Sequence, residues 1–192
     1  MFARGFKTWC ENTAVELRRT LRLQRTDPLG PEQLATQLGV KLCTPREIPG
    51  LSSKAIGVLL DSEKDSWSAV TLSSGDQTLI IFNSSHSLGR RANDIMHELA
   101  HILLGHKPAR MMYFPDGQLA LRTYDPDQEE QATWLAGCLL LPREALIRIR
   151  SSGLDESAAA AHFQVSRILL TYRLDMTGVN QQFRRRHPRG TS

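Results

Sequence analysis

The sequence predicts an α+β fold: a mostly helical single domain with a small antiparallel hairpin packed beside a helix that carries two histidines. Three observations predict it, namely helical periodicity over most of the chain, two short strand-like runs joined by a turn, and the pattern H-E-x-x-H after them. With 192 residues, of which 41% are hydrophobic, the chain can bury one ordinary core. We therefore expect one domain over residues 1–183 and a basic disordered tail over residues 184–192.

The N-terminal part, residues 6–40, is predicted to be mainly helical. Phe6–Leu23 has the periodicity of an amphipathic helix. Pro31–Leu38 is predicted to form a second, short helix, because proline is favoured in the first turn and Gly39 can end it. The residues of the first helix that we expect to face inward are Trp9, Ala14, Leu17 and Leu21.

A hairpin is predicted over residues 67–83. Its strands would be Trp67–Leu72 and Thr78–Asn83, joined by a turn of serine, glycine and aspartate. A separate strand is expected at Val40–Cys43, and a loop followed by one or two helical turns would connect it to the hairpin.

The segment His97-Glu98-Leu99-Ala100-His101 follows the hairpin, inside a predicted helix over residues 90–105. Histidines four residues apart lie on one helix face, where both imidazoles can bind the same zinc ion. The glutamate beside the first histidine then lies next to the metal without binding it, where it can take a proton from water. His97 and His101 are therefore candidate metal ligands, and Glu98 is a candidate general base.

A catalytic zinc ion needs a third protein ligand and an open position. In the class H-E-x-x-H-x-x-G-x-x-H the third ligand is a later histidine, but His106 comes one residue too early and Leu104 replaces the glycine. The third ligand should therefore come from another helix, predicted over residues 129–141. The spacing leaves Glu129 and Glu130 both open, although Glu129 shares its face with smaller residues.

The two segments together resemble the ImmA/IrrE family of zinc metallopeptidases. In that family a short hairpin precedes the H-E-x-x-H helix, and a second helix follows with a pattern close to E-x-x-A-N-x-F-A-x-x-L-L-M-P. The second segment here is Glu129-Glu130-Gln131-Ala132-Thr133-Trp134-Leu135-Ala136-Gly137-Cys138-Leu139-Leu140-Leu141-Pro142. The resemblance covers about residues 67–180, including an upstream arginine (Arg90 or Arg91) and a C-terminal helical part over residues 143–178.

The resemblance implies a zincin-like fold, one zinc ion per chain, and Glu129 as the third ligand beside His97 and His101. Three departures from the family pattern are visible: Thr133 replaces an asparagine, Trp134-Leu135 replaces a small residue followed by an aromatic one, and Asn93 replaces an aromatic residue. Threonine still offers a hydrogen bond at this expected neighbour of the ligands, so we expect the orientation of the ligand set to shift rather than fail.

The resemblance also implies a function, that of a zinc-dependent endopeptidase whose protein substrate is a helix-turn-helix repressor in a stress-response or mobile-element circuit. Bound zinc would lower the pKa of water towards roughly 7, and Glu98 would carry its proton to the leaving amine. The connection over residues 106–128 is long enough for a lid or a substrate-binding loop. Candidates for stabilising the oxyanion are Tyr113, Tyr124 and His106.

Two alternatives are regulators that bind zinc without proteolysis. One would bind DNA, since Pro31–Val40 and Ser157–Leu174 resemble parts of a helix-turn-helix, but the apolar Arg167–Arg173 suits packing better than base recognition. The other is a stress sensor or a toxin–antitoxin component that only binds a partner. A structural zinc ion has four protein ligands, and no nearby residue clearly supplies the fourth, which favours an open, catalytic metal.

The net charge of +4 is unevenly distributed: residues 1–25 and the segment from Arg184 each carry +4, and the part between them carries −4. Such ends could contact nucleic acid, but solvated termini explain them more simply. Cys10, Cys43 and Cys138 show no paired spacing and indicate free thiols in a reducing compartment. The chain shows neither a signal-peptide pattern nor a membrane-length apolar run, so we expect a cytoplasmic protein without a membrane partner.

Overall fold

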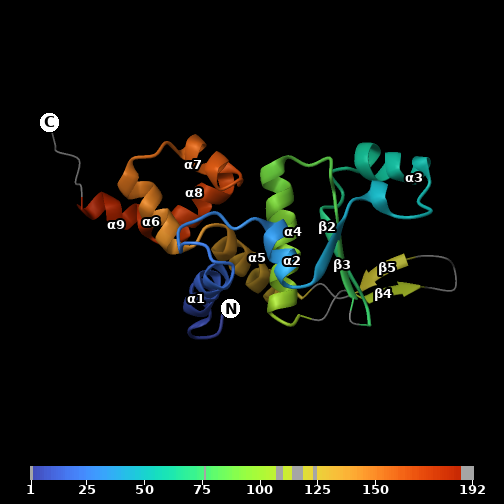
Figure 1. The fold of residues 1–192 in the computed structure, drawn as a ribbon, viewed down its shortest axis with the longest axis horizontal. Helices are drawn as coiled ribbons and strands as arrows, with labels where there is room; N and C mark the ends of the chain where they lie inside the picture. Colours follow the sequence, from blue (N-terminus) through green and yellow to red (C-terminus); the bar gives the residue numbers. More distant parts are fainter. Residues whose placement is uncertain (1, 76, 107–109, 114–118, 123–124, 187–192) are drawn as a thin grey trace.

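The computed structural model describes residues 2–75, 77–106, 110–113, 119–122 and 125–186. It confirms the α+β class, with 61% helix and a small three-stranded sheet in a single domain. The sheet lies on one side and most of the helices on the other, with α4 between them (Figure 1). The helices are α1 (Phe6–Thr20), α2 (Pro31–Gln37), α3 (Ser53–Gly57), α4 (Leu88–Leu103), α5 (Pro126–Leu140), α6 (Arg143–Ser152), α7 (Glu156–His162), α8 (Arg167–Met176) and α9 (Val179–Arg186).

The sheet has the order β1-β3-β2, with β1 (Val40–Cys43), β2 (Ala69–Ser74) and β3 (Gln77–Phe82). The hairpin β2–β3 is antiparallel, as predicted, and begins two residues later than expected. Strand β1, however, pairs in parallel with β3, so the sheet is mixed rather than purely antiparallel. The reason is that the chain after β1 passes through a 3-10 turn (Pro45–Glu47), α3 and a π turn (Val58–Ser62) before it enters β2.

Helix α1 confirms the predicted inward face in part: Ala14 is buried, and Leu17 and Leu21 pack against the core, but Trp9 does not face inward. Trp9 is 44% exposed and stacks on Phe6, whereas Cys10, Ala14 and Arg18 are buried. These three residues are four apart, so they form one continuous stripe against α5, with Leu17 and Leu21 at its edge. The prediction included Trp9 and left out Arg18, because an arginine is rarely expected at a fully buried position.

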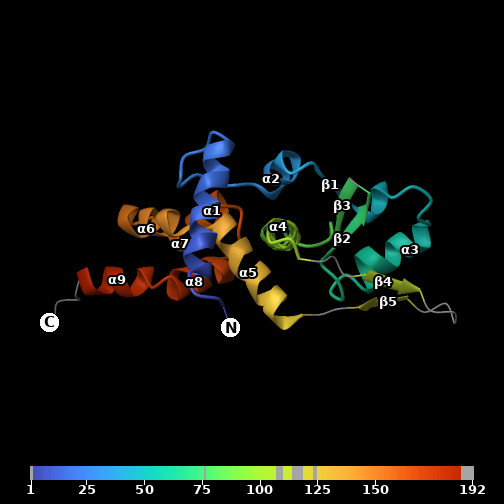
Figure 2. The same cartoon turned by 90° about the horizontal axis from the view of Figure 1, so that it is seen from below.

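Helix α4 lies between the sheet and α5 (Figures 1 and 2). It begins at Leu88, two residues before the predicted start. Helix α5 begins at Pro126, three residues before its predicted start. There the Asp125 carboxylate accepts hydrogen bonds from two backbone amides of the first turn. Every residue from Ala132 to Leu141 is buried except Thr133, which makes α5 the central helix of the core. The two predicted metal helices are therefore packed directly against each other.

The C-terminal part extends further than predicted, because α9 continues to Arg186 and so includes the first three residues of the expected tail. Residues 187–192 lie outside the described residues. In α8, Leu170, Arg173 and Leu174 are buried, as packing predicts, but Ile168 is 83% exposed. Within the described part of the chain, no helix combines the length and the apolar character needed to span a membrane.

The connection between the two metal helices contains a second antiparallel hairpin, β4 (Arg110–Tyr113) with β5 (Leu119–Arg122). The hairpin lies near the sheet and away from the C-terminal helices (Figures 1 and 2). This part of the connection is therefore a β-ribbon rather than an irregular loop.

Candidate metal centre

Three side chains from two helices meet at one point. His97 and His101, one turn apart on α4, face Glu129 from the first turn of α5. The two Nε2 atoms lie 3.0 Å apart, and Glu129 places Oε2 3.1 Å from His97 Nε2 and Oε1 3.5 Å from His101 Nε2. Glu130, the alternative that the sequence left open, is not part of this cluster. All three side chains are partly exposed, so the point on which they converge is open to solvent.

The Nδ1 atoms of both histidines have polar neighbours, so both Nε2 atoms can face the point on which the three side chains converge. His101 Nδ1 lies 2.9 Å from His106 Nδ1, and His106 Nε2 lies 3.3 Å from Gln131 Oε1. One proton arrangement satisfies this chain, in which His101 donates from Nδ1 to His106 and His106 donates from Nε2 to Gln131. His97 Nδ1 lies 3.5 Å from Thr133 Oγ1, which allows the same tautomer there.

This arrangement fits a cation. With both protons on Nδ1, two Nε2 lone pairs and a carboxylate face one another, which is unfavourable unless positive charge lies between them. Burial, with a further contribution from His97, lowers the pKa of His101 to about 4, so its ring is neutral at neutral pH. Metals bind neutral imidazole, and a set of two histidines and one glutamate is typical of catalytic zinc.

The Glu98 carboxylate contacts the sheet, where Thr71 Oγ1 on β2 donates a hydrogen bond to its Oε2. Burial raises the pKa of Glu98, and the hydrogen bond from Thr71 partly opposes this shift. Once ionised, a carboxylate with a raised pKa is a stronger base than one in water. This hydrogen bond holds the Glu98 carboxylate between α4 and β2.

The other predicted site residues divide into two groups. Thr133 and His106 lie next to the two histidines, where they can orient the rings. Both ring nitrogens of His106 lie within hydrogen-bond distance of other side chains, namely His101 and Gln131. Tyr124 and the side chain of Tyr113 lie outside the described residues. The role of either tyrosine as an oxyanion donor stays a prediction.

Two polar contacts near the site were not predicted from the sequence. Thr71 is one of two hydroxyl residues in a predicted strand, and only the packing of the sheet on α4 brings it to Glu98. His86, just before α4, is buried, with Nδ1 2.9 Å from Asp94 Oδ2 and Nε2 2.9 Å from the Lys64 carbonyl oxygen. It connects α4 to the segment before the hairpin, and no motif indicated it.

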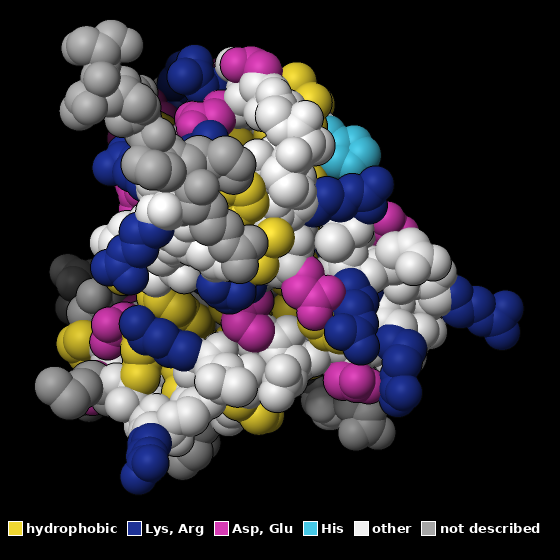
Figure 3. All heavy atoms as spheres, turned by 90° about the vertical axis from the view of Figure 1, so that its left-hand side faces the viewer, with side chains coloured by type: hydrophobic (Ala, Val, Ile, Leu, Met, Phe, Trp, Pro, Cys, Tyr) yellow, Lys and Arg dark blue, Asp and Glu magenta, His cyan; other side chains and the backbone are white. Residues whose placement is uncertain are grey.

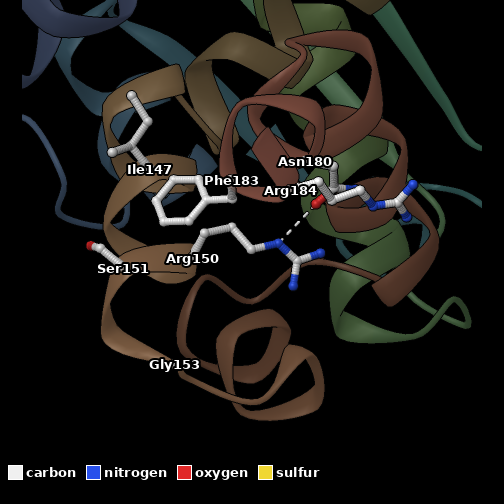
Figure 4. Close-up of a pocket in the computed structure, with 7 residues that line it drawn as sticks. All are labelled: Ile147, Arg150, Ser151, Gly153, Asn180, Phe183 and Arg184. Atoms are coloured by element: carbon white, nitrogen blue, oxygen red, sulfur yellow. Dashed lines mark hydrogen bonds between the residues drawn. The ribbon is translucent and has the colours of Figure 1, made fainter. Parts of the chain in front are cut away.

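A cavity of about 460 Å³ adjoins the cluster and shares Glu129 with it. A larger hollow of about 770 Å³ lies away from the cluster, between α6 and α9 (Figure 4). There Arg150 donates from Nε to Asn180 Oδ1 at 2.8 Å and pairs with Glu156 at 2.7 Å. Its guanidinium is therefore already engaged within the protein.

On the face formed by the C-terminal helices, the described Lys and Arg side chains are spread out with Asp and Glu between them (Figure 3). This distribution gives no continuous basic stripe among the described side chains of that face, such as would follow a nucleic-acid backbone. The exposed side of α8 also carries Ile168, Tyr172 and Asp175, which do not suit a recognition helix. The DNA-binding alternative stays a prediction.

Comparison with known proteins agrees with this geometry. The profile of peptidase family M78, the IrrE N-terminal-like domain, matches residues 53–175, more than half of the chain. The matched range includes Glu98 and the whole cluster of His97, His101 and Glu129, and leaves out α1, α2, β1 and α9. The comparison with curated proteins finds no match. The profile match confirms the family that the two helical motifs resemble.

Proposed function

Because the chain belongs to the IrrE N-terminal-like family of metal-dependent peptidases, we propose that it is a zinc endopeptidase that cuts one specific protein. The observation that carries this proposal is the convergence of His97, His101 and Glu129, with Glu98 next to the first ligand on the same helix. Two imidazole nitrogens and one carboxylate oxygen leave one position of a tetrahedral zinc site open, as catalysis requires.

The reaction is peptide hydrolysis. When bound, zinc supplies the Lewis acidity that activates water near neutral pH and polarises the scissile carbonyl. Glu98 accepts the proton that water loses as it attacks and delivers it to the departing amine. Thr71 holds the Glu98 carboxylate in position, while His106 and Thr133 orient the two imidazoles.

The substrate that we propose is a helix-turn-helix repressor, and the biological setting a stress-response or mobile-element circuit. The support for both is the resemblance to the ImmA/IrrE family, whose members typically cleave such a repressor, often encoded nearby. The partly exposed ligands and the open cavity beside Glu129 are compatible with a protein chain that reaches the site from solvent.

The test is co-expression of the chain with the repressor-like protein encoded nearest to it, with the repressor followed by mass spectrometry. We expect the wild type to make a single cut, and Glu98→Gln to lose the cut by a factor of roughly 10²–10⁴. Because Glu98 is not a proposed ligand, the variant should keep its zinc, measured by metal analysis of the purified protein. An intact repressor that co-purifies equally with both forms would contradict proteolysis and favour a binding-only regulator.

A further inference from the structure

The cavity beside Glu129 is formed by parts of the chain that are distant in sequence. Its lining comes from helix α5, from the N-terminal segment with the start of α1, and from α8. The residues that line it are Phe2, Lys7, Pro126, Glu129, Glu130, Thr133, Trp134, Tyr172 and Met176. At about 460 Å³ it lies within the usual size range of ligand pockets and can hold a large side chain.

The position of the cavity connects it to the metal cluster. Glu129 lines the cavity and also places a carboxylate oxygen 3.1 Å from His97 Nε2. Thr133, one turn further along α5, lines it as well and lies 3.5 Å from His97 Nδ1. A peptide whose carbonyl group lies at the metal would therefore have an adjacent side chain at the mouth of this cavity.

The walls favour an apolar side chain. Phe2, Tyr172 and Met176 provide aromatic and thioether surface, whereas Trp134 is only 7% exposed and has Lys7 Nζ 3.9 Å from the centre of its ring. Both charge signs occur in the lining, so neither an acidic nor a basic side chain finds a site of purely opposite charge. Burial of apolar surface is then the main source of affinity.

The exposed face of α8 supports the same conclusion. Tyr172 and Met176 are 43% and 47% exposed although both are large and apolar in part. They lie four residues apart on the side that faces the cavity, and Ile168, one turn earlier, is exposed but does not line it. Apolar surface left open beside a reactive centre is typical of a binding site.

We propose that this cavity binds a bulky apolar side chain of the substrate residue next to the scissile bond, and that Met176 and Tyr172 of α8 determine this specificity. The inference rests on the proposed function, since it places the scissile bond at the metal. It assigns to α8, a helix without metal ligands, a direct part in substrate selection.

The experiment compares two ligands that differ only in this side chain, glycine hydroxamate and leucine hydroxamate, by calorimetric titration of the zinc-loaded full chain. A hydroxamate chelates zinc, so both compounds share one anchor. We expect leucine hydroxamate to bind the wild type roughly tenfold to a hundredfold more tightly. In Met176→Asp this ratio should fall towards one.

Ile168→Asp is the matched control, because it makes the same kind of change on the same helix outside the cavity, and it should keep the wild-type ratio. Thermal unfolding of both variants checks that the fold is retained. Equal affinities in the wild type, or a ratio that survives Met176→Asp, would overturn the specificity cavity while the metal site stands. If neither hydroxamate binds, the zinc site of the proposed function fails, and this inference fails with it.

Discussion

At the scale of single residues, Thr71 controls how readily Glu98 can act as a base. Burial raises the pKa of Glu98, and the hydrogen bond from Thr71 lowers it, because that bond favours the ionised carboxylate. In Thr71→Val the lowering contribution is lost, so the pKa of Glu98 rises further and a smaller fraction is ionised at any given pH. We expect the acidic limb of the pH–rate profile to move to higher pH, with a loss of roughly tenfold in kcat/KM on that limb.

The measurement is the pH dependence of repressor cleavage by the wild type, Thr71→Val and Thr71→Ser. Serine keeps the hydroxyl and should restore the wild-type profile, which a merely structural role of the threonine methyl group would not predict. Zinc content should be the same in all three proteins. Identical acidic limbs for the valine variant and the wild type would show that Thr71 does not influence the base.

Glu129 and Glu130 are adjacent in sequence, yet only Glu129 belongs to the cluster with the two histidines. We expect Glu129→Gln to weaken zinc binding by roughly a hundredfold or more, because an amide oxygen replaces the anionic ligand. Glu130→Gln removes the same charge one position away and should leave the zinc affinity nearly unchanged. Competition with a zinc-binding dye measures both, and equal losses in the two variants would reject Glu129 as the ligand.

Whether a site residue could be predicted depends on how far along the chain it lies from the other site residues that it contacts. His97, Glu98 and His101 are readable because the helical repeat fixes their relative positions. Glu129 required the family resemblance, since helical spacing alone did not exclude Glu130. Thr71 was not predictable, because its contact with Glu98 depends on how the sheet packs on α4.

At the scale of elements, the packing of α4 against the α7–α8 turn depends on Gly89. A Cβ atom at this position would lie 2.8 Å from both the Ser166 amide nitrogen and the Val165 carbonyl carbon, which are backbone atoms that cannot move alone. Gly89→Ala should therefore lower the free energy of unfolding by about 1–2 kcal/mol, even though alanine favours a helix more than glycine. Urea unfolding measures the change.

Gly57 offers the matched control, since it also has helical backbone angles, but a Cβ atom there would make only an ordinary van der Waals contact, with Asp61 Oδ2 at 3.9 Å. Gly57→Ala should raise the free energy of unfolding by up to about 1 kcal/mol. If Gly89→Ala were as well tolerated as Gly57→Ala, the close approach of α4 to the α7–α8 turn would be wrong.

Elements with strong local patterns were predicted well, and elements defined by their partners were not. The hairpin β2–β3 and the helices α4 and α5 carry alternating or helical patterns and appeared within three residues of their expected limits. The parallel pairing of β1 with β3 joins segments almost forty residues apart, for which a single sequence gives no register. The buried face of α1 was predicted only in part, because Arg18 occupies it.

At the scale of the whole molecule, the part that matches the family profile is bonded to α1, which lies outside the match. Arg18 of α1 is fully buried and donates to the carbonyl oxygen of Leu139 at 2.7 Å, near the end of α5. From α8, Arg173 donates to the Leu141 carbonyl oxygen and pairs with Glu11 of α1 at 2.7 Å. Carbonyl groups at the end of a helix lack helical partners, so these two arginines satisfy them and connect three helices.

This arrangement predicts that the matched range, residues 53–175, does not fold by itself. A fragment of residues 53–175 lacks β1, which pairs with β3, and α1, which packs on α5. Without α1, apolar surface of α5 is exposed, and the Leu139 carbonyl oxygen near the end of α5 loses its hydrogen bond from Arg18. We expect fragment 53–175 to lack a cooperative thermal transition by circular dichroism. Fragment 1–175, which keeps α1 and β1 but loses α9, should retain one, because it preserves the contacts to α5 and β3. A sharp transition in fragment 53–175, with zinc affinity equal to that of the full chain, would show that the N-terminal elements are dispensable for the metal centre.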